Sequence, residues 1–124
     1  MGSEKTILIV EDSITQALLL QQSLEDRGYI VHHARNGEEG LSLAGKIRPD
    51  LIISDIIMPV MDGYRMCEEI KRSPGLKSIP VILLTRMSGP EDVLRGLEAG
   101  ADDYVTKPFS DNYLSLKIKE VLES

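Results

Sequence analysis

Apolar residues follow two alternating patterns along this chain. Short apolar runs, rich in β-branched residues, have the length expected of buried strands and occur at 6–10, 29–34, 51–53, 80–84 and 103–106. Between them, apolar residues recur every three or four positions, as in amphipathic helices, over 13–27, 36–46, 63–72, 90–99 and 110–122. This fivefold alternation predicts an α/β fold in which helices cover both faces of a parallel sheet.

The predicted helices carry recognisable ends. Asn36 with Glu39 has the spacing of a capping box, and Asp62 is well placed to cap the helix that follows it. Gly28 and Gly100 stand where the first and fourth helices should stop. These signals set the predicted boundaries independently of the apolar pattern.

Composition limits the class of protein. The 124 residues are enough for one ordinary hydrophobic core, and no apolar run approaches the roughly 18 residues of a membrane-spanning helix. The lone cysteine, Cys67, excludes an internal disulfide and leads us to expect a cytoplasmic location. The net charge of -6 argues against direct binding of nucleic acid by this domain. We therefore expect one globular domain over 5–124, with a cloning remnant or flexible N-terminus at 1–4.

Polar residues able to do chemistry stand where four of the predicted strands end. They are the pair Glu11-Asp12, then Asp55, Thr85 and Lys107. Because the carboxyl ends of parallel strands share one edge of a sheet, we expect these side chains to converge there. Any one of them alone is an ordinary helix cap, loop hydroxyl or solvated charge. Four independent strand ends make coincidence a poor explanation.

The predicted cluster holds three carboxylates and one ammonium group. Two carboxylates about 4 Å apart repel by about 4 kcal/mol at an effective dielectric constant of about 20, and one lysine cannot balance three acids. A hard divalent cation with oxygen ligands can, and Mg²⁺ (or Mn²⁺) suits a site with few carboxylates. The cluster therefore predicts a metal site.

With these residues in place, the chain resembles the receiver domains of two-component response regulators, including the chemotaxis regulator. The matching motifs are Glu11-Asp12, D-I-I-M-P-V-M-D-G from Asp55, V-I-L-L-T ending at Thr85, and G-A-D-D-Y-V-T-K-P-F from Gly100. The resemblance covers 5–122. It implies a flavodoxin-like (βα)5 three-layer sandwich with strand order 2-1-3-4-5.

The resemblance also implies a role for each residue of the cluster. Asp55 would accept a phosphoryl group from a phosphohistidine, with Thr85 and Lys107 contacting the transferred group. Asp12, Asp55 and the backbone carbonyl of Ile57 would bind the metal directly, and Glu11 would bind it through water. The protein would thus be a stoichiometric phospho-acceptor, not an enzyme in the usual sense.

A conformational switch is implied as well. In the family, the threonine moves inward on phosphorylation and the aromatic residue at the position of Tyr104 turns from exposed to buried. This change would reshape the face formed by 90–122. The bond between Lys107 and Pro108 would be cis.

Some residues depart from the family pattern or lack a role. The position of Arg86 usually holds a small residue. This arginine could narrow donor access, contact the phosphoryl group or turn into solvent, and our hypothesis is that it slows phosphorylation by small donors. His32 and His33 have no metal-ligand spacing and are expected to be ordinary strand residues. Cys67 lies on an apolar helix stripe and is expected in the core.

Two other functions remain open on the sequence. A small Mg²⁺-dependent phosphatase of the haloacid dehalogenase type also uses an aspartate nucleophile, a hydroxyl residue and a lysine, but it places the nucleophile after the first strand. A phosphorylation-silent binding module would keep the fold without the chemistry.

The resemblance further predicts the partners. A histidine kinase or a histidine phosphotransfer domain would supply the phosphoryl group, and a homodimer could form through the last two helices. We expect no membrane association. The chain could be a stand-alone protein or part of a hybrid histidine kinase or multidomain regulator.

Overall fold

The computed structural model describes residues 4–124, so the expectation for the first three residues lies outside the described part of the chain. The elements follow in strict alternation: β1 (Thr6–Val10), α1 (Ile14–Asp26), β2 (Ile30–Ala34), α2 (Gly37–Ile47), β3 (Leu51–Asp55), α3 (Gly63–Arg72), β4 (Val81–Thr85), α4 (Pro90–Glu98), β5 (Asp103–Thr106) and α5 (Asp111–Glu123). Each predicted element is present, and no boundary differs from its predicted position by more than two residues. Among residues 4–124, no helix has the length and apolar character needed to cross a membrane.

The five strands form one parallel sheet with the order β2-β1-β3-β4-β5, which confirms the predicted flavodoxin-like topology. The register places Val10, at the end of β1, opposite Ala34 on one side and Ser54 on the other. At the far side of the sheet, Thr85 lies opposite Thr106. The carboxyl ends of the strands are therefore aligned along one edge, and the residues that follow them emerge together.

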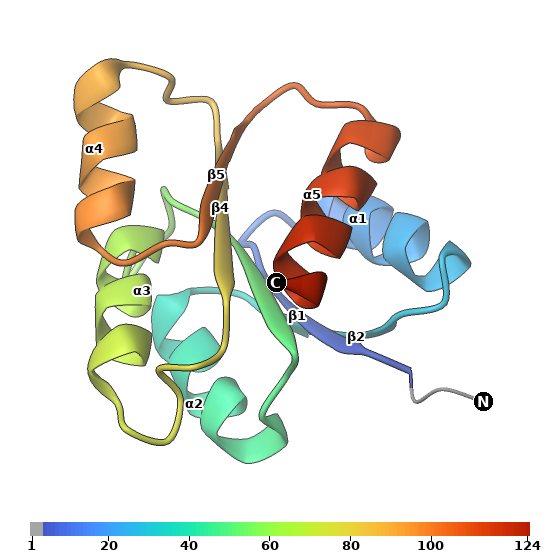
Figure 1. Ribbon diagram of the computed structural model, residues 1–124, viewed down its shortest axis with the longest axis horizontal. Helices are drawn as coiled ribbons and strands as arrows, with labels where there is room; N and C mark the ends of the chain where they lie inside the picture. The colour runs from blue at the N-terminus through green and yellow to red at the C-terminus, as the bar shows by residue number, and fades with distance from the viewer. Residues whose placement is uncertain (1–3) are drawn as a thin grey trace.

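Helices cover both faces of the sheet. Helices α2, α3 and α4 lie on one side, and α1 and α5 lie on the other (Figure 1). A separate apolar cluster fills each interface: Met66, Cys67 and Ile70 of α3 belong to the first, and Leu24 of α1 and Ile118 of α5 to the second. This is the predicted three-layer arrangement.

The helix ends confirm the capping signals in the sequence. The Asp62 carboxylate accepts a hydrogen bond from the Arg65 amide at 2.9 Å, and the Asn36 side chain accepts one from the Glu39 amide at 2.9 Å. Ser13 caps α1 by accepting from the amide of Gln16. The N-terminus of α1, next to the strand ends, is thus fixed by its own sequence.

Helix α1 leaves much of its apolar side-chain surface exposed. Ala17 and Leu24 are buried, but Ile14, Leu18 and Leu19 are 58%, 59% and 66% exposed. The helical spacing of apolar residues is therefore real, yet only part of this stripe faces the sheet. An apolar surface remains on α1.

Candidate functional site

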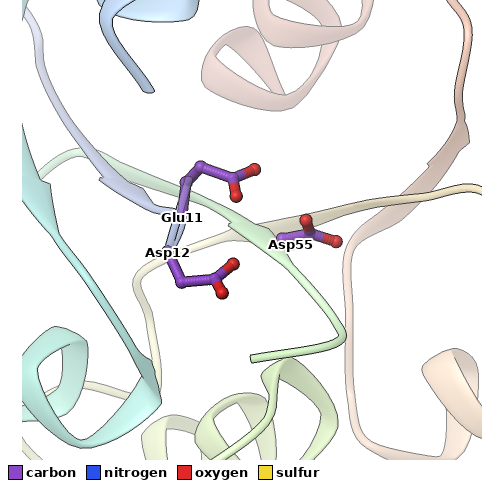
Figure 2. Close-up of side chains that lie close together, drawn as sticks. All are labelled: Glu11, Asp12 and Asp55. Carbon is purple, nitrogen blue, oxygen red and sulfur yellow. The ribbon is translucent and has the colours of Figure 1, made fainter. Parts of the chain in front are cut away.

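Three carboxylates meet at the carboxyl edge of the sheet, as the sequence predicted. Glu11 and Asp12 directly follow β1, and Asp55 is the last residue of β3 (Figure 2). One carboxylate oxygen from each lies within 4.8 Å of the others. Glu11 is buried, Asp55 is half-buried and Asp12 is exposed, so the cluster is open to solvent from one side.

The backbone around this cluster is held by hydrogen bonds beyond the strand ladders. The Glu11 amide donates to the Ala34 carbonyl at 3.0 Å, and the Ile56 amide donates to the Asp55 carboxylate at 2.7 Å. The loop after Asp55 folds back so closely that a Cβ on Gly63 would overlap the backbone oxygen of Asp55. Glycine is therefore required at Gly63 for the loop to hold Asp55 in place.

Lys107 reaches this cluster from the loop after β5. Its ammonium group lies 3.3 Å from the Asp55 carboxylate, 3.5 Å from the Glu11 carboxylate and 2.9 Å from the Gln16 side-chain oxygen. Its backbone amide donates to the Thr85 carbonyl at 2.7 Å. The predicted convergence of lysine and acids is thus present in the structure.

The charges do not balance within these side chains. Burial raises the pKa of Glu11, and the nearby Asp55 carboxylate raises it further, although the Ser13 amide and Lys107 act in the opposite direction. A bound cation would offset the repulsion between the carboxylates of this cluster and favour their ionised forms. The donors of the cluster are all hard oxygen atoms, and this is the ligand set that Mg²⁺ prefers. The residues present therefore fit a magnesium ion.

Thr85 is 2% exposed at the end of β4, and its hydroxyl accepts a hydrogen bond from the Met87 amide at 3.1 Å. The Tyr104 hydroxyl donates to the Met87 carbonyl at 2.7 Å. Met87 therefore joins the side chains of Thr85 and Tyr104 through its own peptide groups. Burial is the main reason why the pKa of Tyr104 is raised, and the neighbouring Tyr64 adds to it.

Several other predictions can be compared with the structure. The bond between Lys107 and Pro108 is cis, as the resemblance implied. His32 and His33 are strand residues, and the His33 ring nitrogen lies 2.7 Å from the Glu11 carbonyl oxygen. Cys67 is fully buried in the core. The role of the Ile57 carbonyl as a metal ligand stays a prediction.

Arg86 is exposed at the rim of a cavity next to the acid cluster. The cavity has a volume of about 730 Å³ and lies beside α1 and the loop between β5 and α5; its lining includes Gln16, Leu19, Lys107 and Phe109. Arg86 therefore stands beside the approach to Lys107, where the sequence had left its orientation open.

Two participants in this site are not predicted from the sequence. Gln16 supplies the shortest contact to the Lys107 ammonium group, and the Met87 backbone connects Thr85 to Tyr104. Ser13 and Gln16 have the spacing of a capping box, but that spacing predicts a contact between Gln16 and the Ser13 amide, not one with Lys107. The contribution of Met87 is made by peptide groups, which any residue carries, so no side-chain pattern could have indicated it.

The fold and this arrangement of side chains define a class of protein, and comparison with known proteins identifies it. The family described as response regulator receiver domain matches residues 7–119, so the chain belongs to that family. Receiver domains interact with histidine kinases or phosphotransfer proteins and bind Mg²⁺ at an acidic site. The acidic residues Glu11, Asp12 and Asp55 fit that site and its phosphorylation chemistry.

Individual relatives agree with this assignment. The chain is 42% identical, over 98% of its length and 47% of the relative, to the probable transcriptional regulator ycf27 of Guillardia theta. It is 53% identical, with a TM-score of 0.90, to the signal receiver domain of a signal transduction histidine kinase from Syntrophus aciditrophicus; the match covers 96% and 90% of the two chains. The chain spans about half the length of the curated regulators it matches first.

One similar structure contains a metal. The receiver domain of the sensor histidine kinase PA1611 from Pseudomonas aeruginosa holds a magnesium ion coordinated in its active-site cleft. It is 30% identical to this chain with a TM-score of 0.91, and the match covers 98% of this chain and all of that one. The relatives are regulators and receiver domains, not conventional enzymes.

Proposed function

We propose that this domain is a phosphorylation switch in which Asp55 accepts a phosphoryl group from a phosphohistidine. The observation that carries the proposal is the convergence of three carboxylates and Lys107 at one sheet edge. A carboxylate oxygen of Asp55 would attack the phosphorus, the bond to the histidine nitrogen would break, and an aspartyl phosphate would form. Asp55 stands at a rigid strand end, half-buried and still reachable from solvent.

The surrounding side chains supply what this transfer needs. Phosphoryl transfer depends mainly on positioning and on neutralising charge at the phosphoryl oxygens. Asp12, Asp55 and the Ile57 carbonyl would hold Mg²⁺, with Glu11 acting through water, and the ion would supply charge neutralisation. Lys107 is 3.3 Å from Asp55 and would contact a phosphoryl oxygen, and Thr85 would hydrogen-bond another.

The change would then reach Tyr104. An aspartyl phosphate adds about -1.5 to -2 charges and three acceptor oxygens beside Thr85. If the Thr85 hydroxyl turns toward the phosphoryl group, it no longer accepts the hydrogen bond from the Met87 amide. The Met87 carbonyl accepts a hydrogen bond from the Tyr104 hydroxyl, so a shift of Met87 would reach Tyr104. This path supports a switch that couples Asp55 to the face formed by α4, β5 and α5.

A histidine kinase or a histidine phosphotransfer domain is the proposed donor. The exposed apolar residues of α1, Ile14, Leu18 and Leu19, lie on the helix whose N-terminus borders the acid cluster. A donor that covers this surface brings its phosphohistidine to Asp55. In this proposal the domain is used stoichiometrically, and its only catalysis is that of its own phosphorylation and dephosphorylation.

Helices α4 and α5 offer a second surface. Leu94 and Leu97 of α4 and Tyr113 and Leu116 of α5 are all about half exposed or more. These residues support the proposed homodimer through the last two helices. Sedimentation of the unmodified and phosphorylated protein tests it, and a monomer in both states at high micromolar concentration would contradict it.

The proposed acceptor is tested by intact mass after incubation with acetyl phosphate and Mg²⁺. We expect one added phosphoryl group on the wild type and none on Asp55→Asn. Asp26→Asn, which changes an exposed aspartate at the end of α1, is the matched control and should label like the wild type. Labelling of Asp55→Asn to the wild-type level would contradict the proposal.

The same reaction separates the alternatives left open by the sequence. A haloacid dehalogenase-type phosphatase would release phosphate from many monoesters with repeated turnover, and family membership gives no support for that activity. A silent binding module would form no adduct with acetyl phosphate or with a phosphohistidine protein. The cytoplasmic location expected from the sequence stays a prediction.

A further inference from the structure

Gln16 makes a contact that its position on a helix would not lead one to expect. It is the third residue of α1, and its backbone amide donates to the capping side chain of Ser13 at 3.3 Å. In a capping box, a glutamine at this position folds back and accepts a hydrogen bond from the amide of the capping residue. Here its side-chain oxygen instead lies 2.9 Å from the Lys107 ammonium group.

The capping role that Gln16 leaves is filled by Glu11. One oxygen of the Glu11 carboxylate accepts from the Ser13 amide at 2.9 Å, and the other lies 3.5 Å from the Lys107 ammonium group. Glu11, Ser13 and Gln16 are thus connected around the N-terminus of α1. The Glu11 carboxylate and the Gln16 amide oxygen both face Lys107. Because Glu11 satisfies the Ser13 amide, Gln16 can contact Lys107 without leaving the end of the helix unpaired.

The distances show how this contact places the lysine. Hydrogen bonds between ammonium and carboxylate groups are usually about 2.7–2.9 Å long. The Lys107 ammonium group is 3.3 Å from Asp55 and 3.5 Å from Glu11, and its shortest contact is to the neutral amide. An ammonium group can only donate, so the amide must present its oxygen. With its shortest contact to Gln16, the lysine lies farther from Asp55 than in a tight ion pair.

We propose that Gln16 is a positioning residue that keeps Lys107 from closing onto the Asp55 carboxylate before phosphoryl transfer. Without the amide oxygen, the ammonium group would settle on one of the two carboxylates. A carboxylate in a tight ion pair is a weaker nucleophile, and a lysine bound to it obstructs the approach of the donor. This role of Gln16 rests on the proposed phosphorylation of Asp55. The contact between Gln16 and Lys107 is independent of that proposal.

The experiment replaces Gln16 by methionine, which has nearly the same shape and helix propensity but no strong acceptor. Gln22→Met, at an exposed position further along the same helix, is the matched control. The rate of adduct formation with acetyl phosphate and Mg²⁺ should fall about fivefold in Gln16→Met, which corresponds to the loss of about one hydrogen bond. The control should keep the wild-type rate.

Gln16→Glu supplies the rescue. It restores an acceptor oxygen at the same reach, so it should recover the rate lost in Gln16→Met, at least in part. Recovery would not follow if Gln16 acted only through the packing or stability of α1. An unchanged or faster rate in Gln16→Met, or no recovery in Gln16→Glu, would overturn the proposal.

A second measurement needs no phosphorylation. The ¹⁵N–¹H correlation of the Lys107 ammonium group should be visible in the resting wild type and in Gln22→Met, and it should shift or vanish in Gln16→Met. An identical signal in all three proteins would overturn the inference. Suppose that the wild type takes up no phosphoryl group from acetyl phosphate or from a phosphohistidine protein, while the Lys107 signal still depends on Gln16. In that case the proposed function has failed but the contact is real.

Discussion

Glu11 serves two partners at once, and the buried position that makes this possible disfavours its charge. Its carboxylate accepts from the Ser13 amide and faces Lys107, while burial and the Asp55 carboxylate raise its pKa. Residues whose arrangement costs stability are commonly retained because function requires them, and the neighbouring Glu11 and Asp55 carboxylates are of this kind.

The consequence for stability can be measured with Glu11→Gln in the absence of metal. Because the pKa of Glu11 is raised above 4.5 in the folded protein, the stability associated with its protonated form is present below that pH. That stability is lost as the pH rises through the folded-state pKa. In urea unfolding with EDTA, Glu11→Gln should therefore be more stable than wild type at pH 7, with a smaller difference near pH 4.5.

With Mg²⁺ present, the wild type should become more stable than Glu11→Gln. Mg²⁺ binds the folded wild type and stabilises it by mass action, whereas the variant lacks one of the acids of the site. Glu4→Gln, an exposed glutamate outside the cluster, should respond to Mg²⁺ like the wild type. An equal gain for wild type and Glu11→Gln on adding Mg²⁺ would contradict the assignment of Glu11 to the metal site.

Arg86 is a second residue whose effect can be isolated. Its exposed guanidinium group stands beside the cavity that leads to Lys107, and we expect it to obstruct small donors. Arg86→Ala should be labelled by acetyl phosphate about threefold faster, a change of about 0.7 kcal/mol in the barrier. Arg72→Ala, an exposed arginine at the end of α3, is the control. Labelling at the wild-type rate or slower would refute the obstruction.

At the scale of elements, the contact between α4 and β5 depends on the absence of a side chain. Gly96 is buried within α4, although glycine is a poor helix former. A Cβ at this position would lie 2.8 Å from the ring of Tyr104. Helix α4 therefore tolerates glycine because the tyrosine ring of β5 occupies the space beside it.

Gly96→Ala should consequently destabilise the protein despite the better helix propensity of alanine. Overpacking against Tyr104 should lower the free energy of unfolding by about 1–3 kcal/mol and shift the NMR signals of the Tyr104 ring. Gly45→Ala in α2 is the matched control, since a Cβ added there would meet no atom within 4 Å. That control should gain about 0.5–1 kcal/mol. A gain in Gly96→Ala as well would refute the close packing.

For the whole molecule, periodicity predicted the alternating elements, the parallel sheet and the converging acids, whereas the strand order was implied by the family resemblance. Residues at the ends of parallel strands must share an edge, so Glu11, Asp55 and Thr85 could be placed together without coordinates. The exposure of Ile14 and Leu18 could not be predicted, because periodicity identifies an apolar stripe but not what covers it. The contact between Gln16 and Lys107 was equally hidden, since it spans 91 positions of the chain.

The connections between elements show how one phosphoryl group could affect a distant face. Thr85 ends β4, next to the edge strand β5, and the Met87 backbone links it to Tyr104, which packs against α4. In Figure 1, β5 lies between α4 and α5 at one side of the sheet. In the proposed switch, a movement of Tyr104 would act first on its contact with Gly96 of α4.

The most direct test of this switch is the amide NMR spectrum of the protein with Mg²⁺, before and after addition of beryllium fluoride, a phosphoryl mimic. We predict shifts at Asp55 and Thr85 that continue through Met87 to Tyr104 and Gly96. Residues near the amino-terminal end of β4, such as Lys71 of α3 and Ile79 of the loop before β4, should show no shift. Asp55→Asn should show none of the predicted shifts. Shifts that stop at Thr85 and leave Tyr104 and Gly96 unchanged would contradict a switch that reaches α4.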